Sequence, residues 1–410
     1  MLMVLRQRNY ARLWTAVLVS AIGNFMLLAA LPYYVYAVSG SVLATGATFA
    51  SEMVPEILFG TIGGVFADRW RRKPVIAGSD LVRALVLLPL LAVHNSSTLW
   101  IVYATAFLGS VPANFAGPFG NAAVPHVVTK SDLAAANAAF SVATNVAVFV
   151  GFPLGGLMWQ HVGLRGVVAV DALSFVLSGF LIASVDVPLE DARASVVREI
   201  GTARHGARRE WLRGLAFVRQ QRWLSLIFII IALVYFGNSI VMVVFAPFVE
   251  HTLGGSAQYF SWVRTAQGAG GIAAGTTAAW VSKRWVPSQL FMLGLLVLGA
   301  LDIGMAIVAS QPVTLGAQFL SGFPALFILA SLNTLLQSHV PDAYRGRVFG
   351  AYSSVKAVAS LLGSLAGGVL ADRLGIPNML GFGGVLFLVA GSVALFTLLP
   401  AIAHVGPESP

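Results

Sequence analysis

The sequence predicts an all-α membrane protein with twelve transmembrane helices in two pseudo-symmetric six-helix bundles. Three observations predict this fold class: an apolar composition, twelve apolar segments long enough to cross a bilayer, and a partial repeat between the two halves. Of the 410 residues, 58% are hydrophobic and 10% are charged, which is far more apolar than a soluble domain. The composition therefore places most of the chain in a membrane.

The second observation is the number of apolar segments. A bilayer core about 30 Å thick takes about 20 apolar residues in a helix, where every backbone polar group is satisfied within the segment. Twelve segments meet this criterion: 13–38, 43–67, 74–93, 99–120, 136–159, 166–185, 223–249, 257–281, 288–309, 313–336, 346–370 and 376–400. We therefore expect an N-terminal bundle over 1–185, a polar linker over 186–222 and a C-terminal bundle over 223–410.

The third observation is a repeat between the halves. Six residues of the first half recur in the second half at one constant offset. Pro32, Gly40, Ser41, Gly60, Arg69 and Trp70 align with Pro247, Gly255, Ser256, Gly275, Arg284 and Trp285. At another offset Gly151, Gly155, Gly156 and Gly163 align with Gly363, Gly367, Gly368 and Gly375. Parallel six-helix repeats form the two halves of one class of alternating-access carriers.

The distribution of basic residues predicts the orientation. Lys and Arg accumulate on the cytoplasmic side, and alternating the loops places about 20 of them on one side against about 2 on the other. We expect a multi-pass inner-membrane protein with both termini and the linker in the cytoplasm. In the linker, Trp211, Leu215 and Val218 recur at helical spacing, which predicts an amphipathic helix on the membrane surface. The net charge of +9 is thus explained by the basic residues of the cytoplasmic loops, and we expect no nucleic-acid partner.

The loop between the second and third segments carries a recognisable motif. Gly64-Val-Phe-Ala-Asp68-Arg69-Trp70-Arg71-Arg72-Lys73 resembles G-x-x-x-D-R-x-G-R-[KR], the cytoplasmic loop signature of the major facilitator superfamily, with arginine at the second glycine. Other stretches resemble the macrolide and siderophore exporter branch: Arg8–Trp14, Ser79–Arg83, Val124–Pro125, Asp171–Phe175 and Val340–Phe349. The resemblance covers the whole chain and implies a secondary active transporter.

The same resemblance implies a gating role for the loop motif, through Gly64, Asp68, Arg69, Arg72 and Lys73. An anion at Asp68 could meet the positive end of the eleventh helix, near Gly346. The alternative is that the cluster only enforces topology.

The fifth segment carries Gly151, Pro153, Gly155 and Gly156, where many antiporters of the superfamily have a G-P-x-x-G-G run. Here the proline is displaced by one residue, which weakens the antiporter signal. Small residues let helices approach closely. Close helix packing and a conformational hinge therefore explain these residues equally well.

Two acids fall deep in the second segment. Glu56 lies near the midplane by helical rise, and Glu52 lies one turn nearer the outside. An ionisable residue there costs at least about 2.5–3.5 kcal/mol, and two carboxylates one turn apart favour a proton held between them. We predict a proton-binding or cation-binding pair. The alternative is a structural salt bridge to Lys356 or Arg264.

Other ionisable residues also lie within predicted spans. Arg264 and Lys356 are candidate counter-ions or contacts for an anionic group of the substrate. Asp80 and Arg83, three residues apart, are predicted to pair with each other. The resemblance implies a peripheral position for Asp302.

The resemblance also implies that the first, fourth, seventh and tenth helices line a central cavity. Asn24 and Asn238, at near-repeat positions, are candidate proton-binding or substrate-binding residues, with interhelical hydrogen bonding as the alternative. Aromatic residues on the same helices suit a bulky amphipathic substrate, although plain packing also explains them: Tyr33, Tyr34, Tyr36, Phe115, Phe119, Tyr235, Phe236, Phe323 and Phe327.

The predicted function is proton-coupled export of amphipathic small molecules, of the multidrug type, by alternating access in a monomer surrounded by lipid. The alternative is a lipid or siderophore carrier without proton coupling. No H-E-x-x-H, G-x-S-x-G or P-loop pattern occurs in the chain, which has no cysteine, so we expect no enzyme, metal site or cofactor. A membrane scaffold or sensor would not need acids at midplane depth.

Overall fold

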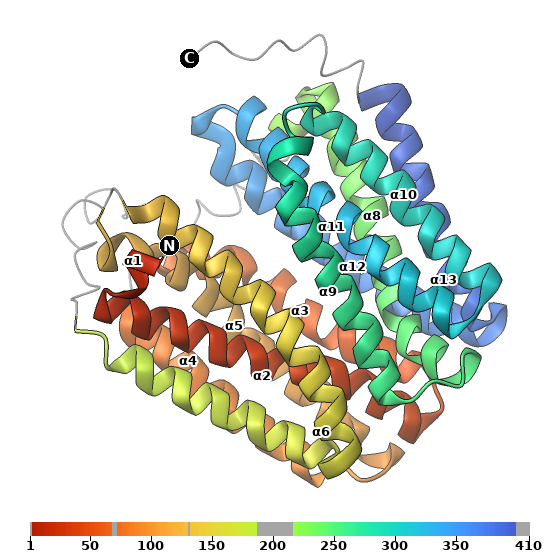
Figure 1. Cartoon of the computed structure of the whole chain (residues 1–410), viewed down its shortest axis with the longest axis horizontal. Coiled ribbons are helices and arrows are strands. Elements are labelled where there is room, and N and C mark those ends of the chain that lie inside the picture. The colour runs from red at the N-terminus through yellow and green to blue at the C-terminus, as the bar shows by residue number, and fades with distance from the viewer. Residues whose placement is uncertain (1, 68–71, 130–131, 187–215, 399–410) are drawn as a thin grey trace. The chain divides into compact units, whose positions relative to one another are not determined.

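The computed structural model describes residues 2–67, 72–129, 132–186 and 216–398, and these residues are helical with no strand among them. The long helices (Figure 1) are α2 (Arg8–Ser39), α3 (Val42–Ala67), α4 (Arg72–Leu87), α5 (Leu99–Val127), α6 (Leu133–Ala183), α8 (Arg222–Pro247), α9 (Ala257–Val281), α10 (Pro287–Val308), α11 (Gln311–His339), α12 (Asp342–Leu374) and α13 (Ile376–Val393). Shorter elements are α1 (Leu2–Leu5), the 3₁₀ turns η1 (Leu88–Ala92) and η2 (Ser96–Thr98), and the π-helical turns η6 (Phe248–Thr252) and η7 (Ala394–Leu398).

The predicted all-α membrane fold is confirmed, and each predicted segment coincides with helical residues as far as the description reaches. Within the described residues, nine helical stretches are long and apolar enough to cross a membrane. One of them is α6, which carries both the fifth and the sixth predicted segments. Its backbone breaks at Gly163, with φ 65° and ψ −169°, a conformation that only glycine adopts readily. The helix folds back at this point (Figure 1), so α6 is two spans.

The chain groups into two compact units. Unit 1 comprises the described residues of Met1–Gly40, Ser51–Ala203 and Ala257–Ser261, and unit 2 comprises those of Ser41–Ala50, Arg204–Ser256 and Trp262–Pro410. The first turns of α3 therefore group with unit 2, and the first turns of α9 group with unit 1. The predicted division into bundles 1–185 and 223–410 stays a prediction.

Unit 1 is built around the packing of α2 against α6. A Cβ at Gly155 of α6 would lie 2.5 Å from the carbonyl oxygen of Met26 and 2.8 Å from its Cα. A Cβ at Gly151, one turn earlier, would lie 2.8 Å from the carbonyl oxygen of Ile22. Because lipid chains are as apolar as leucine, close backbone approach of this kind is a main source of helix association in membranes. Gly151 and Gly155 of the fifth predicted segment therefore lie where α6 approaches the backbone of α2 closely, and their predicted role in packing or as a hinge stays a prediction.

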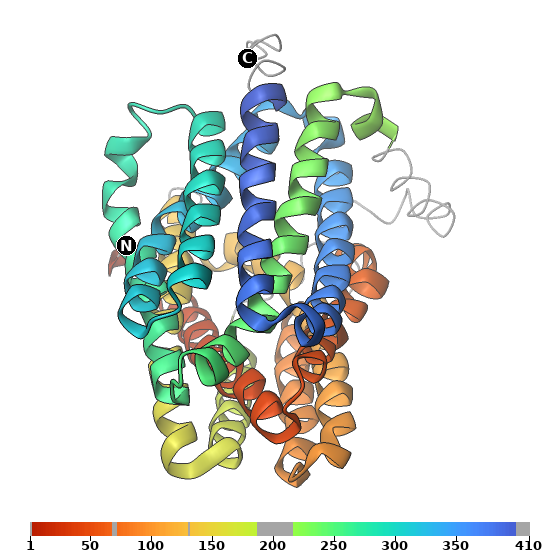
Figure 2. The same ribbon diagram turned by 90° about the vertical axis from the view of Figure 1, so that its right-hand side faces the viewer.

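In unit 2, α8 and α12 also approach each other closely at glycines. A Cβ at Gly363 would meet backbone atoms of Phe236, and one at Gly367 would lie 3.2 Å from the Cα of Ile240. Figure 2 shows α8 beside α13, on which it also packs. A buried apolar cluster that includes Trp223, Leu224 and Phe291 fills the space between these helices.

The last described residues of the linker belong to this cluster. Residues 216–220 are helical, with Val218 buried and Arg219 and Gln220 exposed. Phe217 stacks on Tyr344, with ring centroids 4.2 Å apart. Trp211 and Leu215, on which the predicted amphipathic helix also depends, lie outside the described residues.

Candidate transport site

A polar face of α6 lies inside unit 1. Asp171, Ser174 and Ser178 are spaced by three and four residues, so they share one side of the helix, and all three are buried. The hydroxyl of Ser178 donates a hydrogen bond of 2.6 Å to Oδ2 of Asp80 on α4. The cluster therefore joins two helices through groups that are expensive to place in a bilayer.

Arg83 is the cation of this cluster. Its guanidinium donates to Oδ1 of Asn24 on α2 at 3.1 Å and lies 4.0 Å from the centre of the Phe175 ring. Its charge interacts with the carboxylates of Asp80, Asp171 and Glu52. The predicted pair of Asp80 and Arg83 therefore interacts through its charges. The side-chain hydrogen bonds of these two residues are made with Ser178 and Asn24 instead. Asn24, a predicted site residue, is one of these partners.

Asp171 is fully buried. Its Oδ1 accepts a long hydrogen bond of 3.4 Å from the hydroxyl of Ser174, and within the described residues its Oδ2 has no hydrogen-bond partner. Gly23 of α2 covers it, since a Cβ there would lie 2.5 Å from Oδ1. Asp171 is not among the site residues predicted from the sequence, although an acid in the sixth predicted span was a sufficient signal.

Glu52 and Glu56 are half-buried on α3. The carboxylate of Glu52 interacts with the charge of Arg83. Helix α3 therefore also contributes an acid to the cluster around this arginine. Arg83 thus faces three acids, from α3, α4 and α6. The predicted proton-binding role of Glu52 and Glu56 stays a prediction.

Unit 2 contains a separate polar network around Arg264 of α9. The guanidinium donates to Oε1 of Gln267 at 3.3 Å and to Sδ of Met242 at 2.7 Å. The amide of Gln267 donates in turn to the hydroxyl of Ser321 at 3.3 Å, so the network reaches from α8 through α9 to α11.

The counter-charge of Arg264 within unit 2 is Asp302 of α10. This carboxylate is 3% exposed and interacts with the charge of Arg264. The resemblance implied a peripheral position for Asp302, and its burial next to a charged network shows that it is an internal residue. One cation and one acid give this network no net charge.

An apolar groove of about 480 Å³ runs between α8 and α12. Its walls are Ala232, Leu233, Phe236, Ser354, Val355, Val358, Ala359 and Leu362. The groove precedes the close approach at Gly363, where the two helices come together. Tyr235 and Tyr352, which are close in sequence to lining residues of both helices, form a hydrogen bond of 2.7 Å between their hydroxyls. Apart from Ser354, the walls of the groove are apolar.

The remaining predicted binding residues of unit 2 lie on the same two helices. Asn238 is exposed on α8, and Lys356 is half-buried on α12. Their predicted roles in binding a proton or a substrate stay predictions.

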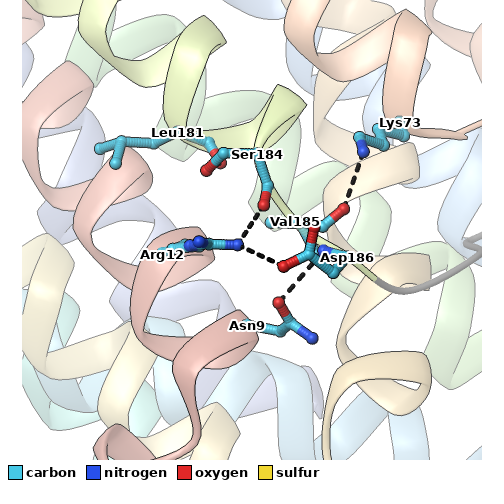
Figure 3. Close-up of polar contacts among 7 residues, drawn as sticks. All are labelled: Asn9, Arg12, Lys73, Leu181, Ser184, Val185 and Asp186. Carbon is cyan, nitrogen blue, oxygen red and sulfur yellow. Dashed lines mark hydrogen bonds and ion pairs between the residues drawn. The ribbon is translucent and has the colours of Figure 1, made fainter.

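The predicted gating motif is only partly described. Asp68 and Arg69 lie outside the described residues, and Gly64 and Arg72 are on α3 and α4. The ammonium of Lys73 donates a hydrogen bond of 2.7 Å to the carbonyl oxygen of Val185, just after α6 (Figure 3). A cation at a helix C-terminus is favoured by the helix dipole. Lys73 therefore ties the start of α4 to the end of α6.

Arg12 binds the same end of α6 from the first turns of α2 (Figure 3). Its guanidinium pairs with Asp186 at 2.8 Å and donates to the carbonyl oxygen of Ser184. The backbone N–H of Asp186 donates to Oδ1 of Asn9 at 3.1 Å. Three helices of unit 1 are thus fastened by a polar clasp made of Asn9, Arg12, Lys73 and Asp186.

Comparison with known proteins decides the family. Residues 1–409 match the family described as transmembrane secretion effector, of the major facilitator superfamily. The chain belongs to this family. It is therefore a multi-pass membrane transporter and not an enzyme, as the sequence predicted.

Curated relatives of this transporter include efflux proteins. It is 23% identical over 408 residues to macrolide efflux protein A of Streptococcus pyogenes, which covers 97% of this chain and 95% of that protein. It is 27% identical over 377 residues to the multidrug efflux pump Tap of Mycobacterium bovis, which covers 88% of this chain and 86% of that protein. A third relative, the uncharacterized MFS-type transporter YfiS of Bacillus subtilis, is 25% identical over 411 residues, 95% of this chain and 93% of that protein.

Solved structures agree on the fold. A peptide transporter POT mutant in complex with alafosfalin superposes with a TM-score of 0.77 at 15% identity, over 98% of this chain and 96% of that one. A bacterial homologue of the iron transporter ferroportin, in an inward-facing state, gives 0.75 at 15% identity, over 95% and 98%. At these identities the likeness concerns the fold alone.

Proposed function

We propose that this transporter exports amphipathic small molecules in exchange for protons, by alternating access. The observation that carries the proposal is the excess of acids around Arg83. Within unit 1, Glu52, Asp80 and Asp171 all interact with this one cation. Ionised together they would leave uncompensated negative charge in a bilayer, which is strongly unfavourable. Protons are the simplest means of neutralising the remaining acids.

The acids of α3 are the proposed coupling residues. Glu52 and Glu56 are both half-buried, whereas Asp171 is fully buried. A site that exchanges protons against substrate must be reached from water in at least one state. This accessibility favours Glu52 and Glu56 over the other acids for the exchange itself.

The groove between α8 and α12 supports an amphipathic substrate. A volume of about 480 Å³ is within the range of small-molecule sites. Its apolar walls suit a hydrophobic body, and the Tyr235–Tyr352 pair offers hydroxyls to a polar end. The names of two relatives, a macrolide efflux protein and a multidrug efflux pump, point to the same class of compounds.

The proposal is tested in inverted membrane vesicles. Uptake of a macrolide and of a fluorescent amphipathic cation is measured with an imposed pH gradient, and again after a protonophore collapses it. We expect Glu52→Gln and Glu56→Gln to lose gradient-driven uptake but to retain exchange of labelled for unlabelled substrate. Asp372→Asn, which removes an exposed acid at the end of α12, is the matched control and should behave as the unmodified protein.

Two results would contradict the proposal. Unchanged gradient-driven uptake and pH dependence in both glutamine variants would remove Glu52 and Glu56 from the coupling. Uptake by the unmodified protein that persists after the gradient is collapsed would instead indicate a carrier without proton coupling, such as one for lipids or siderophores.

A further inference from the structure

We propose that Asp171 is a further proton-binding residue, closed off beneath α2 in this conformation, and that Arg83 compensates its charge when the proton leaves. The proposal rests on the proposed proton coupling only for its role in transport, because proton binding itself can be measured without substrate. Its basis is the contrast between two buried acids of unit 1, Asp171 and Asp80.

Asp80 has the partners of an ionised carboxylate. It is 6% exposed, it accepts a short hydrogen bond of 2.6 Å from Ser178, and the charge of Arg83 acts on it. Short hydrogen bonds to a carboxylate are the strong, charge-assisted kind. One cation and one acid on the same helix, three residues apart, compensate each other. This pair uses the single positive charge of the cluster.

Asp171 lacks such partners. It is 0% exposed. Among the described residues, its only hydrogen bond from a side chain is the 3.4 Å contact with Ser174, and nothing donates to Oδ2. A buried carboxylate ion without donors pays a desolvation cost that a protonated carboxyl group avoids. The geometry therefore fits the neutral acid, with the proton on an oxygen that has no other donor.

The surroundings of Asp171 supply a way to hold and release that proton. Gly23 of α2 lies directly over the carboxyl group, since a Cβ there would be 2.5 Å from Oδ1. Asn24, the next residue, holds Arg83 by a hydrogen bond of 3.1 Å. A movement of α2 away from α6 would uncover the acid and free the guanidinium in one step.

Arg83 is poised to take up the new charge. It lies over the ring of Phe175, which is one helical turn after Asp171 on the same face of α6. The charged groups that act on this arginine are Asp80 of α4, Asp171 of α6 and Glu52 of α3. Loss of the Asn24 hydrogen bond would let the guanidinium turn toward Asp171 as the proton departs into water.

Infrared spectroscopy of the full-length protein in lipid vesicles tests the proposal without any substrate. A protonated carboxyl group absorbs above the amide region and shifts in heavy water. We expect such a band in the unmodified protein and the loss of one component of it in Asp171→Asn, which keeps the shape and neutrality of the protonated acid. Asp372→Asn, which removes an exposed acid at the end of α12, is the control and is expected to retain the band.

A second variant keeps the test decisive if Asp171→Asn folds poorly. Arg83→Gln removes the compensating cation, so the band should persist at pH values at which the unmodified protein loses it. An unchanged band in Asp171→Asn, or a loss of intensity in Asp372→Asn, would overturn the proposal. So would loss of the band on adding sodium at constant pH, which would indicate a metal-cation site.

The two proposals fail separately. A band that belongs to Asp171 in a transporter whose uptake ignores the pH gradient would leave this inference standing and remove the proposed coupling. Gradient-driven uptake in a protein without such a band would do the reverse.

Discussion

Gly155 offers the sharpest test of how unit 1 is held together. Replacing it with alanine puts a Cβ 2.5 Å from the carbonyl oxygen of Met26, where real Cβ contacts essentially never fall below 3.0 Å. The difference, 3.0 minus 2.5, means that α2 and α6 must separate by at least about 0.5 Å along their tightest contact. Because the obstructing atoms are backbone, no side-chain rotation relieves the clash. Overpacking of this kind costs about 1–3 kcal/mol.

The measurement is the apparent unfolding temperature of the purified protein, followed by the intrinsic fluorescence of its 9 tryptophans. A loss of about 1 kcal/mol corresponds to about 2–4 °C for a folding unit of about 150–250 residues, so we expect Gly155→Ala to unfold several degrees lower. Gly78→Ala on α4 is the matched control, because a Cβ there meets nothing within 4 Å. Helix propensity alone favours alanine by about 0.5–1 kcal/mol. Equal unfolding temperatures for the two variants would refute the close packing of α2 and α6.

Three further predictions concern other parts of the chain. Arg12→Gln removes the ion pair between Arg12 and Asp186, whose side chains are 20% and 70% exposed respectively, so the loss of stability should be at most about 1 kcal/mol. The unfolding temperature should fall slightly at low salt and equal that of the unmodified protein at high salt. A salt-independent effect would contradict an exposed ion pair. Ala232→Trp fills the groove between α8 and α12 and is expected to lower uptake of amphipathic probes, whereas Leu329→Trp, on an exposed position of α11, should not; equal uptake by both variants would exclude the groove as a substrate surface. Tyr235→Phe removes the hydroxyl bonded to Tyr352, and binding assays should show weaker affinity for probes with a hydrogen-bonding end and unchanged affinity for those without one.

Much of the fold could be predicted because a bilayer leaves few alternatives. A segment of about 20 apolar residues in lipid has to be helical, so length and hydropathy located the helices well. The break at Gly163 was also predictable as the end of the fifth segment. Helix ends were less so: α5 and α11 continue several residues past their predicted limits, to Val127 and His339, because helices persist into the interfacial region after hydropathy has fallen.

The candidate site was predicted less completely. Glu52, Asn24 and Arg83 were each recognised in the sequence as polar residues inside a span, and the structure relates all three to one cluster. Asp171 was noted only as part of a family motif. The fully enclosed acid at the centre of the cluster was therefore overlooked, since its importance depends on neighbours from other helices.

The sequence by itself determined that this chain is an α-helical membrane transporter, because hydropathy, charge distribution and motif spacing are properties of the chain alone. Only the tertiary structure decided which acids share a cation and which lack a hydrogen-bond donor. Residues that are far apart in sequence become neighbours through close packing at glycines such as Gly23 and Gly155. That packing brings Asp171 under α2 and Arg83 beside Phe175, an arrangement that no periodicity within a single helix specifies.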